Sequence, residues 1–249
     1  MLGVRPGPKG LGKEVDSMNW REKYRNKLVS AEEAVKAVKS GDRIIVNLGG
    51  EPSHCLHALA KRADELRGVK MACSWSYDYP WFHPGLENSF DVGTTFTARA
   101  TRLALRERRI SYIPWLPGLG ERDRCLEQGR ACVQQHADVA FVVVTPPDDQ
   151  GYCSFGNQYW NAPNAVRTAK VVVAEVNEKI PFVFGENVPV SKIDYLVEAP
   201  EDSRPTTMPG TEWTTTNVEE WEKEQVIASI AADLVRDGDT LQVGIGTPS

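Results

Sequence analysis

Two runs made almost entirely of apolar residues constrain the fold of this chain more than any other feature. Residues 138–144 read DVAFVVV, and residues 171–176 read VVVAEV. Strands with one face in water alternate apolar and polar residues, whereas strands buried on both faces carry continuous apolar runs of this kind. A sheet that is buried on both faces needs a layer of helices on each side. The two runs therefore predict a parallel sheet between helices.

Further strands and helices alternate along the chain. Strands are also predicted at 43–48 and 69–73, and helices at 31–38, 53–67, 97–109, 121–136 and 158–169. The first helix has a capping box, in which Ser30 and Glu33 satisfy each other's backbone amides. The order predicts the α/β class, with a mostly parallel sheet flanked by helices on both faces. Ligands of such sheets bind beyond the C-terminal ends of the strands, which selects the loops at 49–53, 145–156 and 244–249.

Composition excludes several functions. A chain of 249 residues with 41% hydrophobic residues can bury a core without disulfides or metals. The net charge of −5 argues against nucleic-acid binding. The sequence contains no run of 18 apolar residues, which argues against a membrane span. The five cysteines lack paired spacing, which predicts reduced thiols and a cytoplasmic protein.

The chain is expected to have four parts. Residues 1–17 are rich in Gly, Pro and Lys and lack the apolar centre of a signal peptide, so we expect a flexible extension. Residues 18–199 form the α/β domain, and residues 200–217 form a linker or a long excursion rich in Pro, Thr and Gly. Residues 218–249 contain a helix to about 236 and a strand at 240–243. The apolar face of that helix consists of Val226, Ile227, Ile230, Ala231 and Leu234.

The end of the chain repeats its beginning. A helix, a Gly-Asp turn, a strand and a glycine loop occur at both ends with an offset of 197 residues. The matched positions are Gly41 and Gly238, Asp42 and Asp239, and Gly49 and Gly246. The second copy is either an edge strand added to the same sheet, or the start of a second, similar domain whose remainder lies on another chain or was removed.

Several motifs in this order resemble family I CoA-transferases. They include SAEEAV at 30–35, SGDR at 40–43, Glu51-Pro52, TPPD at 145–148, GYCSFG at 151–156 and DGDTLQVGIG at 237–246. The resemblance covers about residues 19–246 and is closest to 4-hydroxybutyrate and butyrate CoA-transferases and acetyl-CoA hydrolases. It implies a CoA-transferase N-terminal domain of the NagB/RpiA-like fold, followed by the first strand of an incomplete second domain.

The resemblance also implies a mechanism. In the family, a glutamate attacks an acyl-CoA thioester, a glutamyl-CoA thioester forms, and a second carboxylate takes the CoA. Coenzyme A is then a substrate, and no permanently bound cofactor is expected. The nucleophilic glutamate lies downstream of the Gly-Ile-Gly loop, and no glutamate of this chain matches it. The hypothesis is a heteromeric enzyme in which a partner subunit carries the C-terminal domain and the catalytic glutamate. The alternatives are an acyl-CoA hydrolase subunit and a non-catalytic CoA- or acyl-binding module.

The candidate substrate-binding residues come from the three strand-end loops. They are Gly49, Gly50, Glu51, Pro52, Ser53, Pro146, Pro147, Asp148, Gly151, Ser154, Gly156, Gly244 and Gly246. Amides at the start of the helix after Pro52 could hold a carboxylate or a thioester oxyanion. Each loop also has a purely structural interpretation. The first is a tight turn in which Glu51 favours the positive helix end, and in the second Asp148 caps backbone amides.

Other chemistries have weaker signals. Cys153 has no histidine in a triad pattern, and His54, Cys55 and His57 match no strong zinc signature, so no metal is expected. The Gly244-Ile245-Gly246 loop lacks the third glycine of a dinucleotide site.

Two further patterns stay open between a functional and a structural interpretation. Four arginines with helical spacing could bind the phosphates of CoA, although a solvated face is the commoner explanation. They are Arg99, Arg102, Arg106 and Arg109. The aromatic stretch at 75–82 could line an acyl pocket, form a subunit contact or pack over the core.

Overall fold

The computed structural model describes residues 19–46, 50–75, 77–114, 137–156, 160–183, 185–203 and 218–242. The chain divides into two units, Met1–Thr206 and Thr207–Ser249. In the described part of the chain, no helix is long and apolar enough to cross a bilayer.

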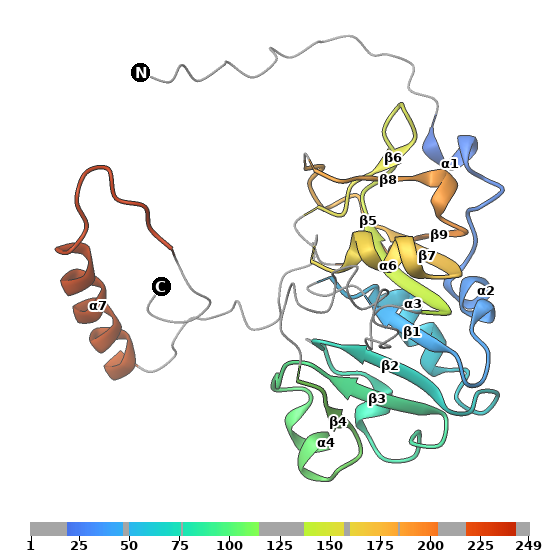
Figure 1. Ribbon diagram of the computed structural model, residues 1–249, viewed down its shortest axis with the longest axis horizontal. Helices are drawn as coiled ribbons and strands as arrows, with labels where there is room; N and C mark the ends of the chain where they lie inside the picture. The colour runs from blue at the N-terminus through green and yellow to red at the C-terminus, as the bar shows by residue number, and fades with distance from the viewer. Residues whose placement is uncertain are drawn as a thin grey trace, which may run out of the picture. The chain divides into compact units, whose positions relative to one another are not determined.

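A seven-stranded sheet forms the centre of the first unit (Figure 1). Its strands are β1 (Arg43–Val46), β2 (Val69–Cys73), β3 (Phe90–Thr94), β4 (Ser111–Tyr112), β5 (Val139–Val144), β7 (Val171–Val176) and β9 (Tyr195–Glu198). Neighbouring strands are parallel throughout, in the order β4-β3-β2-β1-β5-β7-β9. The predicted parallel sheet is confirmed, and its two apolar runs are central strands.

The strand order contains one reversal. From β1 the chain adds strands outward to β4, and it then returns to the other side of β1 to form β5, β7 and β9. The connections after β1 and β5 therefore leave the sheet in opposite directions. Ligands of open parallel sheets bind at such a switch point, at the C-terminal ends of the strands.

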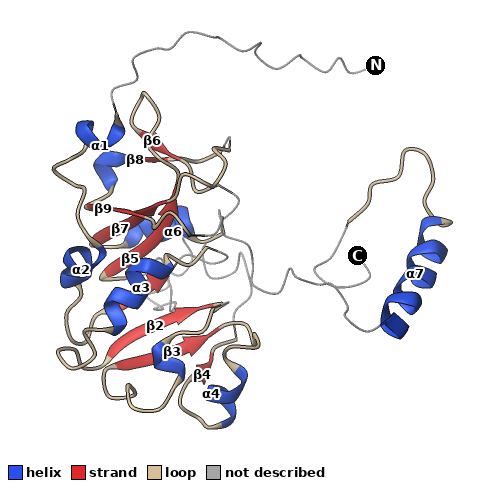
Figure 2. Cartoon of the chain, turned by 180° about the vertical axis from the view of Figure 1, so that it is seen from behind, coloured by secondary structure: helices blue, strands red, loops and turns tan. Residues whose placement is uncertain are grey.

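Helices cover both faces of the sheet, as predicted. Alternate residues of β1 point to opposite faces. Ile44 and Val46 pack in a core with α2 (Ala31–Ala34) and α3 (Ser53–Ala60), whereas Ile45 packs with Ala165 of α6 (Ala162–Thr168). Figures 1 and 2, which view the chain from opposite sides, show α6 in front in one and α2 and α3 in front in the other.

The remaining elements are short. They are α1 (Trp20–Lys23), η1 (Val35–Ala37), η2 (Pro80–Phe82), α4 (Arg102–Arg106), η3 (Val190–Lys192) and the antiparallel pair β6 (Tyr152–Cys153) and β8 (Val188–Pro189). Strands β3, β4 and β9 are not predicted by the apolar runs. Two of these three, β4 and β9, are the sheet edges, where burial on both faces is not required.

Several predicted helices are shorter than their sequence patterns. The helix predicted at 53–67 ends at Ala60 and continues as turns, and the helix predicted at 97–109 covers only Arg102–Arg106. Arg108 adopts a left-handed φ of 56°, which a continuing helix cannot accommodate. The helix predicted at 158–169 is Ala162–Thr168, and the one predicted at 121–136 lies outside the described residues.

Helix α2 shows one half of the predicted capping box. The Ser30 hydroxyl accepts a hydrogen bond from the Glu33 amide at 3.2 Å, whereas the Glu33 carboxylate pairs with Lys36. The short α2 that follows continues as the 3-10 turn η1.

The second unit contains α7 (Val218–Ala232). The apolar residues predicted to share one face of this helix are exposed; Val226 and Ile230 are 59% and 61% exposed. The strand predicted at 240–243 does not form over the described residues 240–242. A strand forms only beside a hydrogen-bonding neighbour, and the unit offers none among its described residues.

The internal repeat is visible in the two Gly-Asp turns. Gly41 and Gly238 have left-handed φ angles of 82° and 90°. The next residue closes each turn in the same way, because the carboxylates of Asp42 and Asp239 each accept a backbone N–H three residues earlier at 2.8 Å. The sequence repeat is therefore also a repeat of local structure.

Candidate functional site

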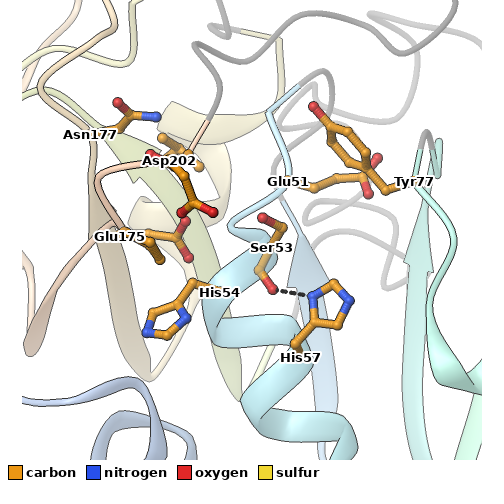
Figure 3. Close-up of a pocket in the computed structure, with 11 residues that line it drawn as sticks. Glu51, Ser53, His54, His57, Tyr77, Glu175, Asn177 and Asp202 are labelled. Atoms are coloured by element: carbon orange, nitrogen blue, oxygen red, sulfur yellow. Dashed lines mark hydrogen bonds between the residues drawn. The ribbon is translucent and has the colours of Figure 1, made fainter.

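A pocket of about 340 Å³ opens at the C-terminal ends of the central strands (Figure 3). It lies where the strand order reverses, the position expected for a ligand site. Its lining residues come from the segments that follow β1, β2, β7 and β9, and from β5, β7 and α3. They are Glu51, Ser53, His54, His57, Tyr77, Val143, Glu175, Asn177, Pro200, Asp202 and Ser203.

Glu175 is a buried carboxylate in the wall of this pocket. It is the fifth residue of β7 and is 3% exposed. One carboxylate oxygen, Oε2, accepts a hydrogen bond from the backbone amide of Cys55 at 3.0 Å. Burial raises the pKa of Glu175 to about 7, against the opposing effect of hydrogen bonds from Cys55 and His54. Glu175 is therefore a group whose charge changes near neutral pH.

The same hydrogen bond occupies an amide at the start of α3 that the sequence predicts to be open to a ligand. The sequence predicts that amides there are open to a ligand's carboxylate or oxyanion. In the structure, the amide of Cys55 is occupied by Glu175, which caps the helix from a neighbouring strand. The bond gives a partner to an amide that has none within the helix, so it caps α3 as well as shaping the pocket.

The pocket is acidic. Glu51, from the segment between β1 and α3, is 3% exposed, and its charge adds to burial in raising the pKa of Tyr79. Asp202 contributes a third carboxylate from the turn after β9. Among the described lining residues there is no lysine or arginine. Ionised together, the three carboxylates would oppose the entry of an anion.

Two histidines complete the polar lining. Nδ1 of His57 lies 2.7 Å from the carbonyl oxygen of Ser53, drawn as a dashed line in Figure 3. A carbonyl only accepts, so Nδ1 carries the proton and donates, and Nε2 of the neutral ring is an acceptor. His54, on the preceding turn of α3, lines the pocket beside Glu175. The pocket therefore offers carboxylates, an imidazole nitrogen, a hydroxyl and an amide to a ligand.

The first predicted site loop leads into this pocket. Glu51 and Ser53 line it, and Gly50 and Pro52 are buried beside them. Gly49, Gly244 and Gly246 lie outside the described residues.

The second predicted site loop is closed by hydrogen bonds of its own. The Asp148 carboxylate accepts from the amides of Gln150 and Tyr152 at 3.0 and 2.8 Å. The buried Ser154 hydroxyl accepts from the amides of Gly156 and Val183, both at 3.1 Å. The predicted residues of this loop do not line the switch-point pocket; they are Pro146, Pro147, Asp148, Gly151, Ser154 and Gly156. The structural interpretation of Asp148, as a cap of backbone amides, is confirmed.

Sequence reasoning missed most of the pocket lining. Among its polar residues, Glu175, Asn177, Asp202 and Ser203 have no predicted role. Glu175 does carry a signal, because it is the one charged residue in the run VVVAEV. A carboxylate at the end of a strand that is buried on both faces costs desolvation energy, and such positions are frequently functional.

The other sequence patterns have structural roles. Trp75, Tyr79, Trp81 and Phe82 are at most 3% exposed and pack against one another, so the aromatic stretch belongs to the core; Tyr77 alone of its described residues lines the pocket. The predicted arginine stripe does not form. Its last member follows the left-handed turn, donates to the carbonyl of Phe82 and pairs with Glu107.

The described cysteines are poor nucleophiles. Burial raises the pKa of Cys153 to about 12, and it raises the pKa values of Cys55 and Cys73 well above the usual range. The thiolate is the reactive form, and very little of it exists at neutral pH in such surroundings. Among the described residues, no group of three or more His, Cys, Asp or Glu side chains converges as for a metal.

Comparisons with known proteins agree on one family. A sequence profile of the acetyl-CoA hydrolase/transferase N-terminal domain matches residues 12–207. The chain is 34% identical to the 4-hydroxybutyrate coenzyme A transferase of Clostridium kluyveri, over 92% of the chain and 51% of that protein. The structure resembles RipA from Yersinia pestis with a TM-score of 0.73 and 26% identity, over 92% of this chain and 53% of RipA.

A second solved structure is also similar. The 4-hydroxybutyrate CoA-transferase of Porphyromonas gingivalis matches with a TM-score of 0.58 and 29% identity, over 92% of this chain and 50% of that one. The chain spans about half the length of the curated relatives it matches.

Proposed function

Because this chain belongs to the acetyl-CoA hydrolase/transferase family through its N-terminal domain, we propose that it forms one half of the active site of an acyl-CoA:carboxylate CoA-transferase. Homology to CoA-transferases implies CoA thioesters as substrates. Coenzyme A is then a substrate that comes and goes, and the proposal includes no permanently bound cofactor.

The observation that carries this proposal is the switch-point pocket. A member of this family has, at the strand ends where a ligand is expected, a hollow of about 340 Å³ with buried polar walls. Glu51, from the family-like Glu51-Pro52 motif, and the adjacent Ser53 line it. We assign the acyl or carboxylate end of the substrates to this pocket, because the lining offers acceptors and donors but no cationic side chain for phosphates among the described residues.

The proposed reaction runs in two halves. A glutamate carboxylate attacks the acyl-CoA carbonyl, the C–S bond breaks, and an acyl-glutamyl anhydride and CoA thiolate form. The thiolate then attacks the glutamyl carbonyl of the anhydride and releases the first carboxylic acid as its carboxylate. The resulting glutamyl-CoA thioester passes its CoA to the second carboxylate by the same steps in reverse. No oxidant, reductant or proton source is required overall.

We further propose that the nucleophilic glutamate lies in a C-terminal CoA-transferase half carried by a partner chain. The chain corresponds to about half of its relatives, and no glutamate in it matches the nucleophile's motif. Glu51 and Glu175, the two buried glutamates of the pocket, are then wall residues, not nucleophiles.

The test is isolation of the native complex from its source, with every subunit identified by mass spectrometry. The complex is incubated with an acyl-CoA and no acceptor acid. The expected result is transfer activity once acetate or butyrate is added, and a covalent CoA adduct on a glutamate of a second chain. An adduct on Glu51 or Glu175, or a single longer polypeptide, would overturn the partner assignment. Thioester hydrolysis with no transfer to any acid would favour the hydrolase, and CoA binding without turnover would favour a binding module.

A further inference from the structure

We propose that Glu175 is a positioning residue whose single proton sets the charge of the pocket, so that a carboxylate substrate binds when Glu175 is neutral and is repelled when it is ionised. This inference rests on the proposed function in one respect: the carboxylate is the acceptor acid of the transfer reaction. Glu175 is not proposed to react.

The position of Glu175 makes it part of the frame of the pocket. It projects from β7, a central strand, and its carboxylate holds the amide of Cys55 at the start of α3. Ser53 and His54, the residues just before that amide, line the pocket on the α3 side. The hydrogen bond from Cys55 to Glu175 thus fixes the wall that Ser53 and His54 form.

The surroundings of Glu175 make its charge matter. Three titratable residues interact with Glu175 directly: Cys55 and His54 on α3, whose backbone amides donate to its carboxylate, and Tyr79 after β2. The other titratable groups of the pocket lining are Glu51 between β1 and α3, His57 on α3, Tyr77 after β2 and Asp202 after β9. The described lining contains the carboxylates of Glu51, Glu175 and Asp202 and no lysine or arginine. Charges in a buried site are weakly screened, so an ionised Glu175 repels an incoming carboxylate more strongly than a surface group does.

Burial also places the ionisation of Glu175 between pH 6 and pH 8. It raises the pKa of Glu175 to about 7, so the group is mostly neutral at pH 6 and mostly ionised at pH 8. If only the neutral form admits the carboxylate, its affinity falls about tenfold between these pH values. Acetate is fully ionised over the same range, so the ligand's own titration adds nothing.

The experiment compares three versions of the native complex from pH 6 to pH 8. The wild type, Glu175→Gln and Glu186→Gln are assayed with a saturating acyl-CoA donor and varied acetate. Glu186 is a matched control, because it is an exposed carboxylate paired with Arg167 and does not line the pocket. We expect KM for acetate to rise about tenfold in the wild type and in Glu186→Gln, and to change less than twofold in Glu175→Gln.

The glutamine variant separates charge from structure. Its amide oxygen can still accept from the Cys55 amide, so the wall is kept while the proton is removed. A variant that lowers kcat equally at every pH and keeps the wild-type rise in KM would assign Glu175 a structural role only and overturn the proposal. If Glu175→Gln does not fold, the carboxyl carbon shift of Glu175 in labelled wild-type complex reports its titration directly, and a midpoint near pH 4 would overturn the proposal.

A binding measurement distinguishes this inference from the proposed function. Acetate binding to the same three complexes is followed by calorimetry without acyl-CoA. Binding that weakens with pH in the wild type but not in Glu175→Gln, in a complex that transfers CoA to no acid, would refute the proposed reaction and leave the role of Glu175 intact. Transfer activity together with pH-independent acetate binding in the wild type would support the proposed reaction and refute the proposed role of Glu175.

Discussion

Two strand-end loops of similar composition have different roles in this molecule: one lines the pocket and the other does not. The segment after β1 contains Gly50, Pro52 and Ser53, and the loop after β5 contains prolines, glycines and Ser154. Both follow central strands of the same parallel sheet, on either side of the switch point. The first lines a pocket with polar walls. The second uses its polar side chains to hold its own backbone and the amide of Val183, and it pairs, through β6, with β8.

The difference comes from the neighbours of each loop. The first loop is held from outside, by Glu175 on β7, so its own side chains remain available to a pocket. The second loop uses Asp148 and Ser154 to hold its own backbone, and Ser154 also holds the amide of Val183. Glycine and proline at a strand end therefore predict a turn, and the partner that fixes the turn decides whether it can become a site.

The largest expected effect tests the self-held loop. In Ser154→Ala, the buried amide of Gly156 and the partly buried amide of Val183 lose their acceptor. We expect the free energy of unfolding to fall by about 3 kcal/mol. Chemical denaturation measures the change, with the exposed Ser191→Ala as the matched control. Equal stability of the two variants would show that the loop is not held by Ser154.

The next effect tests the loop that is held from outside. The folded pKa of Glu175 lies above its unfolded value, so the folded state binds the proton more tightly. The cost of the buried charge is absent below about pH 4.5, grows up to about pH 7 and is then constant, so stability falls as the pH rises. Glu175→Gln has no such charge. Its stability relative to the wild type should therefore increase by about 2 to 3 kcal/mol from pH 5 to pH 8.

Denaturation of both proteins at pH 5 and pH 8 measures this difference, and Glu186→Gln serves as the exposed control. A constant difference between Glu175→Gln and the wild type would mean that Glu175 does not titrate in this range.

A smaller effect separates the two kinds of cap. Asp148 accepts two amide hydrogen bonds from within its own turn, in a partly exposed position. Asp148→Ala should cost about 1 kcal/mol of stability and leave KM for acetate unchanged, because the loop does not line the pocket. Asp149→Ala, next in the chain and exposed, is the control. A raised KM in Asp148→Ala alone would connect this loop to substrate binding after all.

The smallest expected effect is an absence of reaction. Cys55 belongs to the first region and Cys153 to the second, and burial raises the pKa of both thiols. Iodoacetamide at pH 8 should leave both cysteines unmodified in the native complex while labelling them fully after unfolding. Peptide mass spectrometry resolves the two sites. Rapid labelling of Cys153 in the native complex would show that its thiol is reactive and would favour a nucleophilic role.

Much of the fold could be predicted, because it rests on local patterns. The runs at 138–144 and 171–176 become the adjacent central strands β5 and β7. The capping residue Ser30 and the two Gly-Asp turns also act locally, through bonds that span at most three residues. The family resemblance inferred from ordered motifs is likewise confirmed by the matching profile over residues 12–207. Helix ends were predicted less well, because the termini of α3 and α4 depend on turns that the apolar pattern does not contain.

The candidate site could be predicted only in part. The sequence by itself determined the class of the fold, the parallel sheet and the strand-end loop that carries Glu51 and Ser53. Only the tertiary structure brought Glu175 to Cys55, 120 residues earlier in the chain, and separated the loop at 145–156 from the pocket. The physical reason is that periodicity and turn chemistry act between near neighbours, whereas burial, desolvation and the pairing of strands depend on which distant residues the fold places side by side.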